Sequence, residues 1–71
     1  MKMVAAQNSS NIAEHGYDPE TRTAAIRFKN GGLYHYDGVS AEDYAAFAAA
    51  QSLGSHFHKN WRAKYNGVKQ P

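Results

Sequence analysis

The alternation of apolar and polar residues in the first half of the chain predicts an antiparallel sheet. The apolar side chains of Ala24, Ile26 and Phe28 recur at every second position, a period that is typical of a half-buried strand. The break at Asn30 and Gly31 is a strong hairpin signal, so the chain is expected to return in a following strand. The predicted strands cover residues 11–17, 23–29 and 33–36.

After Val39 the apolar period lengthens to about 3.6 residues, which predicts helices. Ser40 is expected to cap a first helix that runs to about Gln51, with the acidic Asp43 three residues after the cap. Ser55 is expected to cap a second helix. Along it an aromatic residue recurs at every fourth position, and these residues are Phe57, Trp61 and Tyr65.

Three strands followed by two helices predict an α+β fold in the order β-β-β-α-α. We expect a small three-stranded antiparallel sheet with the two C-terminal helices packed on one face. A chain of 71 residues is long enough for one domain at most. Residues 1–9 are expected to be a flexible arm, residues 10–66 the single domain and residues 67–71 a tail.

The composition narrows the classes of protein to which the chain can belong. It contains no cysteine, which excludes disulfide frameworks, thiolate metal sites and cysteine nucleophiles. Its longest apolar run is far shorter than the roughly 20 residues that cross a bilayer. The apolar stretch at its start is too short for a secretory signal. We therefore expect no membrane partner and a cytoplasmic location.

Positive charge is concentrated near the C-terminus. Residues 1–51 carry four Lys or Arg against six Asp or Glu, whereas residues 52–71 carry four Lys or Arg and no acidic residue. Lys59 and Arg62 lie three positions apart on the second predicted helix, so they are surface neighbours and the best candidates for phosphate contacts. A solvated helix face, or a surface for a protein partner, explains the same charges equally well.

The register of the hairpin decides where Tyr34 and Tyr36 point. With a two-residue loop, both tyrosines share a face with Arg27 and form an aromatic and basic platform of the kind that stacks unpaired bases. With a three-residue loop that contains a left-handed glycine, both rings enter the core. The pairs across the hairpin are then Phe28 with Tyr34 and Ile26 with Tyr36. We favour the core placement, because the sheet needs these rings to cover its helices.

Several spaced elements of the chain, taken together, resemble the KTSC family, which is named for the C-terminus of some lysyl-tRNA synthetases. The central mark is the Tyr-x-Tyr of Tyr34 and Tyr36, and the resemblance spans about residues 9–65. The other matching elements are Asn11-Ile12, Gly16-Tyr17-Asp18, Phe28-Lys29-Asn30-Gly31, Val39, Tyr44, Gly54-Ser55 and Phe57 through Arg62. Trp61 departs from the aliphatic residue expected at its position. The resemblance implies a stand-alone bacterial or phage protein and RNA binding, and it brings no catalytic residues.

No arrangement of reactive side chains predicts an enzyme or a metal site. His56 and His58 lie two positions apart on a helix, so they point about 200° apart and do not converge on one ion. No cofactor is expected. The remaining enzyme hypothesis is a metal-free ribonuclease that uses His58, Lys59, Arg62 and Tyr65 to move protons and hold phosphate.

We therefore expect a small non-enzymatic module that binds RNA or single-stranded nucleic acid. The candidate binding residues are Arg27, Tyr34, Tyr36, His58, Lys59, Arg62 and Lys64. The alternative is a protein-interaction module, such as a phage-encoded modulator of a host protein, which would use the same surface. The open edges of a small sheet also allow a weak homodimer.

Overall fold

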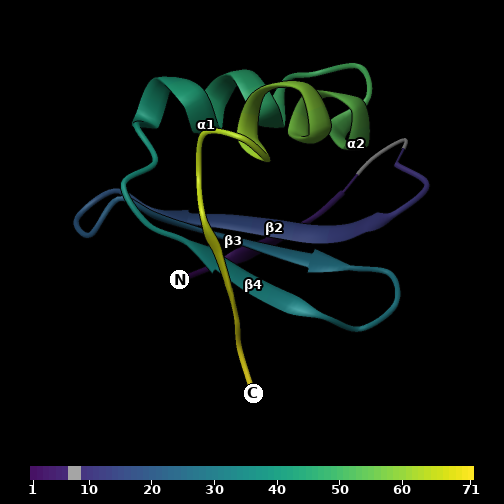
Figure 1. The fold of residues 1–71 in the computed structure, drawn as a ribbon, viewed down its shortest axis with the longest axis horizontal. Helices are drawn as coiled ribbons and strands as arrows, with labels where there is room; N and C mark the ends of the chain where they lie inside the picture. Colours follow the sequence, from purple (N-terminus) through teal and green to yellow (C-terminus); the bar gives the residue numbers. More distant parts are fainter. Residues whose placement is uncertain (7–8) are drawn as a thin grey trace.

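The structure, a computed structural model, describes residues 1–6 and 9–71. Its strands are β1 (Met3–Ala5), β2 (Ile12–Asp18), β3 (Thr23–Phe28), β4 (Leu33–Tyr36) and β5 (Gly67–Lys69). Its helical segments are α1 (Ala41–Ala48), α2 (Leu53–His56) and the π-helical turn η1 (Phe57–Trp61), which continues α2. The helical segments form a layer over one face of the sheet (Figure 1). Within the described residues, no helix has both the length and the apolarity that a membrane crossing requires.

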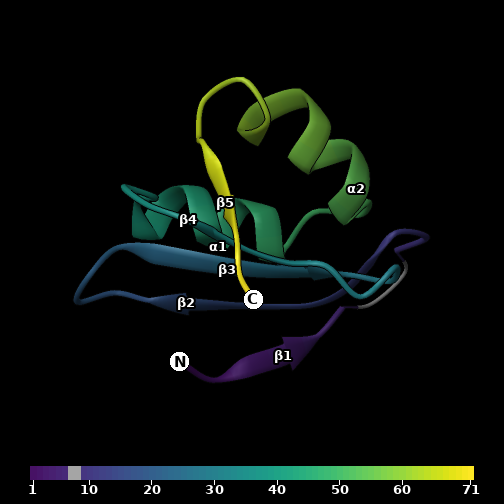
Figure 2. The same cartoon turned by 60° about the horizontal axis from the view of Figure 1, so that its bottom comes forward.

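The sheet has five antiparallel strands in the order β1-β2-β3-β4-β5, so the expected three-stranded sheet is wrong. The two additional strands form its edges (Figure 2). β1 comes from residues 1–9, the expected arm, and pairs with β2. β5 comes from residues 67–71, the expected tail, and pairs with β4. Gln7 and Asn8 of the expected arm lie outside the described residues.

The edge strands escape sequence analysis because each is only three residues long. A segment of that length cannot display a clear period of two. Their pairing depends on β2 and β4, whose outer backbone groups would otherwise have no partner in the sheet. The signal for β1 and β5 therefore lies in the neighbouring strands and not in the segments themselves.

The β3–β4 hairpin turns at Gly31, which adopts the left-handed region with a φ of 99°. The N–H of Phe28 donates to the carbonyl of Gly32 over 2.8 Å, so Gly32 continues the ladder and the loop is residues 29–31. The cross-strand pairs are Ile26 with Tyr34 and Ala24 with Tyr36, two positions away from the expected pairs, which are wrong. Side chains alternate with a period of two, so this shift keeps both tyrosines on the helix-covered face. Their placement on the core face is confirmed.

Aromatic rings fill much of the space between the sheet and the helices. Trp61 is the largest fully buried side chain among the described residues. Its ring centroid lies 4.9 Å from that of Phe47 and 5.9 Å from that of Tyr36. Tyr36 also meets Phe57 edge to face at 5.6 Å. A core with few branched aliphatic side chains thus takes its volume from rings.

The first helix begins where the sequence predicts. The hydroxyl of Ser40 accepts a hydrogen bond from the N–H of Asp43 over 3.1 Å. α1 ends at Ala48, short of the expected end at Gln51. The alanines near this end favour a helix and contain no signal that ends it, so the sequence predicts too long a helix. In the structure the chain turns here, and Leu53 enters the core.

The second helix begins three residues earlier than expected, because its cap is Ser52 and not Ser55. The hydroxyl of Ser52 accepts a hydrogen bond from the N–H of Ser55 over 3.3 Å. The early start makes Leu53 the first helical residue and buries its side chain to 3% exposure. Burial of this leucine explains the choice between two serines that are equally good caps.

Candidate functional site

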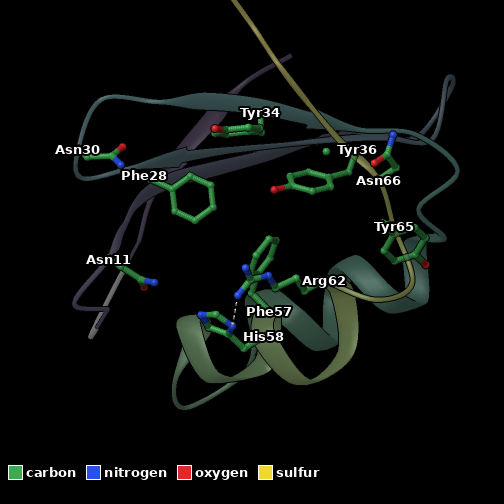
Figure 3. A pocket seen from close by; sticks show the side chains of 11 residues that line it. Asn11, Phe28, Asn30, Tyr34, Tyr36, Phe57, His58, Arg62, Tyr65 and Asn66 are labelled. Carbon is green, nitrogen blue, oxygen red and sulfur yellow. Dashed lines mark hydrogen bonds between the residues drawn. The ribbon is translucent and has the colours of Figure 1, made fainter.

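An open cavity of about 410 Å³ lies between the helix-facing side of the sheet and the second helical segment (Figure 3). Small-molecule sites commonly measure about 300–1,000 Å³. The lining residues are Asn11, Phe28, Asn30, Tyr34, Tyr36, Phe57, His58, Arg62, Tyr65, Asn66 and Gly67. We call this space the aromatic cavity, because Phe and Tyr rings make up five of its lining residues.

The rings of the aromatic cavity hold one another in place. Phe28 meets Tyr34 and Phe57 edge to face, with ring centroids 5.6 and 5.7 Å apart. Such contacts fix the orientation of each ring. Tyr34 is nevertheless only half-buried, so part of its ring remains accessible to a ligand.

The Tyr36 hydroxyl points into the aromatic cavity (Figure 3). Burial, and to a lesser degree the nearby Tyr34, raises the pKa of Tyr36 to about 12. The hydroxyl is therefore protonated at neutral pH and can both donate and accept a hydrogen bond. It contributes a neutral polar group to the cavity.

Three exposed asparagines, Asn11, Asn30 and Asn66, add side-chain amides to the lining. The Oδ1 of Asn30 accepts a hydrogen bond from the N–H of Gly32 over 3.0 Å, which orients its amide. The Asn11 amide lies close to Gly54, where an added Cβ would be 2.7 Å from its Oδ1. An amide carries both donors and acceptors, as does the edge of a nucleobase.

The basic side chains of the lining are Arg62 and His58, one helical turn apart. Arg62 Nη1 donates a hydrogen bond to His58 Nδ1 over 3.3 Å, drawn as a dashed line in Figure 3. That bond requires a lone pair on Nδ1, so the imidazole carries its proton on Nε2. The ion pairs among the described residues are Arg27 with Glu14 and Lys64 with Asp43. Arg62 thus has no carboxylate partner within the described chain, and its charge is available to an anion.

The structure brings four of the predicted site residues together around the aromatic cavity, and they are Tyr34, Tyr36, His58 and Arg62. Lys59 lies beside them, in an adjoining hollow that shares His58 with the cavity. These positions are what the structure establishes. The part that each residue plays in binding stays a prediction.

Arg27 and Lys64 lie apart from the aromatic cavity. Arg27 Nε donates to Glu14 Oε1 over 2.9 Å, and the register places this pair on the sheet face that the helices leave uncovered. The platform of Arg27 with both tyrosines, which the sequence left open as the alternative to core placement, therefore does not form. Lys64 Nζ donates to Asp43 Oδ2 over 2.8 Å. Both carboxylates lie far away in the sequence, so local spacing gave no sign of these pairs.

The asparagines and Phe28 and Phe57 were not predicted as site residues. Asn30 and Asn66 each precede a glycine, and both pairs indicate turns. The two turns line the same cavity only because β5 returns to the sheet beside β4. The sequence contains the two Asn-Gly signals but does not show that both turns border one cavity.

The side chains of the ribonuclease hypothesis are not all directed to one place. His58, Arg62 and Tyr65 line the aromatic cavity, whereas Lys59 does not. The Tyr65 hydroxyl donates its hydrogen bond to Asp43 Oδ2, which also accepts a hydrogen bond from Lys64 Nζ. Among residues 1–6 and 9–71, no three His, Cys, Asp or Glu side chains gather into a metal-site cluster.

The fold and the cavity define a small α+β domain with a five-stranded antiparallel sheet and helices on one face. The chain belongs to the KTSC domain family, whose sequence profile matches residues 8–65. It is 40% identical over 65 residues to an uncharacterized protein of Stutzerimonas stutzeri strain A1501, covering 92% of this chain and 90% of that protein. A crystal structure of a KTSC domain protein from Yersinia pestis superposes with a TM-score of 0.93 at 31% identity, covering 99% of this chain and 97% of that one. The resemblance inferred from the sequence is confirmed.

Proposed function

We propose that the protein is a small non-enzymatic module that binds single-stranded RNA, and that the aromatic cavity receives an unpaired base. The observation that carries the proposal is the meeting of rings, exposed amides and the Arg62 guanidinium around one open cavity of about 410 Å³. Aromatic rings stack on bases, and amides hydrogen-bond to base edges. A guanidinium without an internal carboxylate partner suits the phosphate backbone.

The family context favours RNA over DNA as the ligand. KTSC domains take their name from the C-terminus of some lysyl-tRNA synthetases, which are enzymes that act on RNA. An RNA ligand is also in keeping with a cytoplasmic location. The proposal needs no cofactor, because recognition rests on stacking, hydrogen bonds and charge.

Two arginine variants form a matched test of the proposal. Arg62→Gln and Arg27→Gln each remove one arginine charge, but only Arg62 lines the aromatic cavity. Binding to fluorescent single-stranded ribo-oligonucleotides is measured by anisotropy, starting at about 50 mM salt, where electrostatic contacts are least screened. We expect Arg62→Gln to weaken binding and to make the slope of log K against log salt shallower by about 0.7. Arg27→Gln is expected to leave both unchanged.

Two outcomes count against the proposal. Equal losses in the two variants would show that binding follows net charge and not the cavity. No binding of single-stranded or structured RNA by the natural chain would overturn the proposal. It would favour the protein-interaction module, in which the cavity receives an aromatic or cationic side chain of a partner.

A further inference from the structure

A second hollow adjoins the aromatic cavity beside α2. It measures about 290 Å³ and is lined by Ser10, Asn11, Ser52, Gly54, Ser55, His58 and Lys59. We call it the serine hollow. Asn11 and His58 line both spaces, so the serine hollow and the aromatic cavity meet at these two side chains.

The chemistry of the serine hollow differs from that of its neighbour. Serine hydroxyls and the Asn11 amide offer hydrogen-bond donors, and Lys59 adds a full positive charge. Within residues 1–6 and 9–71, no carboxylate lines the hollow, so no negative charge there opposes an anion. No Phe, Tyr or Trp of the described chain lines it either, which makes it poorly suited to a base.

Among the described residues, Lys59 differs from Lys64 in having no carboxylate partner. Lys64 is held by Asp43 over 2.8 Å. Lys59 is exposed and takes part in neither ion pair of the described residues. A lysine that borders a donor-rich hollow without a carboxylate is suited to an anion with several acceptor oxygens, such as phosphate.

We propose that the serine hollow is a phosphate subsite. The inference rests on the proposed function: the two spaces together accept one nucleotide unit of a single strand. Its base lies among the rings of the aromatic cavity, and its phosphate lies among the serines with Lys59. Asn11 and His58, at the junction, face the ribose.

The test compares ligands with and without a phosphate on the complete chain. The four ribonucleosides and their 3′- and 5′-monophosphates are titrated into ¹⁵N-labelled protein, and affinities are taken from amide chemical shifts. We expect a monophosphate to bind about tenfold more tightly than its nucleoside. Lys59→Gln should reduce that advantage to about twofold or less without changing nucleoside affinity. Lys64→Gln, which removes a lysine outside the hollow, should preserve it.

The outcomes separate the subsite from the proposed function. If nucleosides bind and the phosphate adds nothing, the subsite is overturned while the base-binding function stands. If Lys64→Gln reduces the advantage as much as Lys59→Gln, the effect is one of net charge and the subsite is again overturned. If neither nucleosides, monophosphates nor oligonucleotides bind, both proposals fail.

A single-stranded pentaribonucleotide gives a second readout that does not depend on the affinity of single nucleotides. We expect Lys59→Gln to make the salt slope shallower by about 0.7, the contribution of one phosphate contact, and Lys64→Gln to leave it unchanged. Because Lys59 is exposed, the variant should keep the amide spectrum of the folded chain. If folded Lys59→Gln has the same salt slope as the natural chain, the phosphate subsite is overturned.

Discussion

Tyr34 and Tyr36 belong to one strand and one face, yet their surroundings differ. Tyr36 is 5% exposed and packs against Phe57 and Trp61 in the centre of the core. Tyr34 is half-buried at the wall of the aromatic cavity, where its ring meets Phe28. The structure therefore assigns mainly a packing role to one tyrosine and leaves the other available to a ligand.

Substitution by alanine should separate these roles. Tyr36→Ala is expected to lower the free energy of unfolding by about 3 kcal/mol, because it empties a buried site. Tyr34→Ala is expected to lower it by about 1 kcal/mol and to weaken binding of a single strand by about 1–3 kcal/mol, the value of one stacked base. Urea unfolding and oligonucleotide titration measure the two effects. Equal losses of stability in the two variants would contradict the assignment of different roles to Tyr34 and Tyr36.

His15 is the buried polar side chain of the core, at 6% exposure. Its Nδ1 lies 2.7 Å from the Tyr44 hydroxyl, and its ring meets Phe47 edge to face. Burial lowers the pKa of His15 from the ordinary value of 6.5, because the charged imidazolium would lose its hydration. The neutral imidazole is thus the form that the fold accommodates.

The stability of the fold should consequently depend on pH. Below pH 6.5 His15 takes up a proton in the unfolded chain, whereas the lowered pKa keeps the folded chain neutral until a lower pH. The unfolded state then binds more protons, so stability falls as the pH drops through this window and is independent of His15 above it. Urea unfolding between pH 5 and 8 should show this fall in the natural chain and in His58→Gln, whose side chain is exposed. The fall should be reduced in His15→Gln, and an unchanged pH profile in that variant would refute the assignment.

Among the elements, α2 offers a direct check on where a helix begins. Ser52 caps α2, whereas Ser55 lies within it. Ser52→Ala should lower the free energy of unfolding by about 1 kcal/mol, since it removes the cap. Ser55→Ala should change it by less than about 0.5 kcal/mol. Thermal unfolding compares the two variants, and a larger loss at Ser55 would place the helix start where the sequence alone had predicted it.

At the scale of the whole molecule, local signals fixed part of the fold and long-range contacts the rest. The strand around Ile26 and Phe28 and the helix start at Ser40 depend on residues that are close together in the sequence, so both were predictable. The edge strands depend on backbone groups that other strands present, and no local pattern reveals them. The aromatic cavity likewise requires the turns of Asn30 and Asn66 to border one space, although they are far apart along the chain.

The two outer edges of the sheet bear on self-association. β1 and β5 are three residues long, and each carries a valine at 51% exposure, Val4 and Val68. Short edges with a nearby lysine, such as Lys69 on β5, limit pairing with a second sheet. We expect a monomer at micromolar concentration and a weak homodimer only at much higher concentration. Sedimentation velocity over a concentration series measures this, and a dimer that persists on dilution would contradict it.

The position of β5 in the chain has a consequence for the order of folding. The first four strands follow one another along the chain. The pairing of Tyr36 with Gly67, in contrast, closes a long loop that contains both helical segments. Closing a long loop costs more entropy than closing a hairpin, so we expect β5 to join the sheet last and to detach first. Asn66 and Gly67 form one wall of the aromatic cavity, and Gly67 lies so close to Tyr36 that an added Cβ would be 2.6 Å from its ring. Local detachment of this last strand would expose the Tyr36 ring and widen the open aromatic cavity without unfolding the rest of the domain.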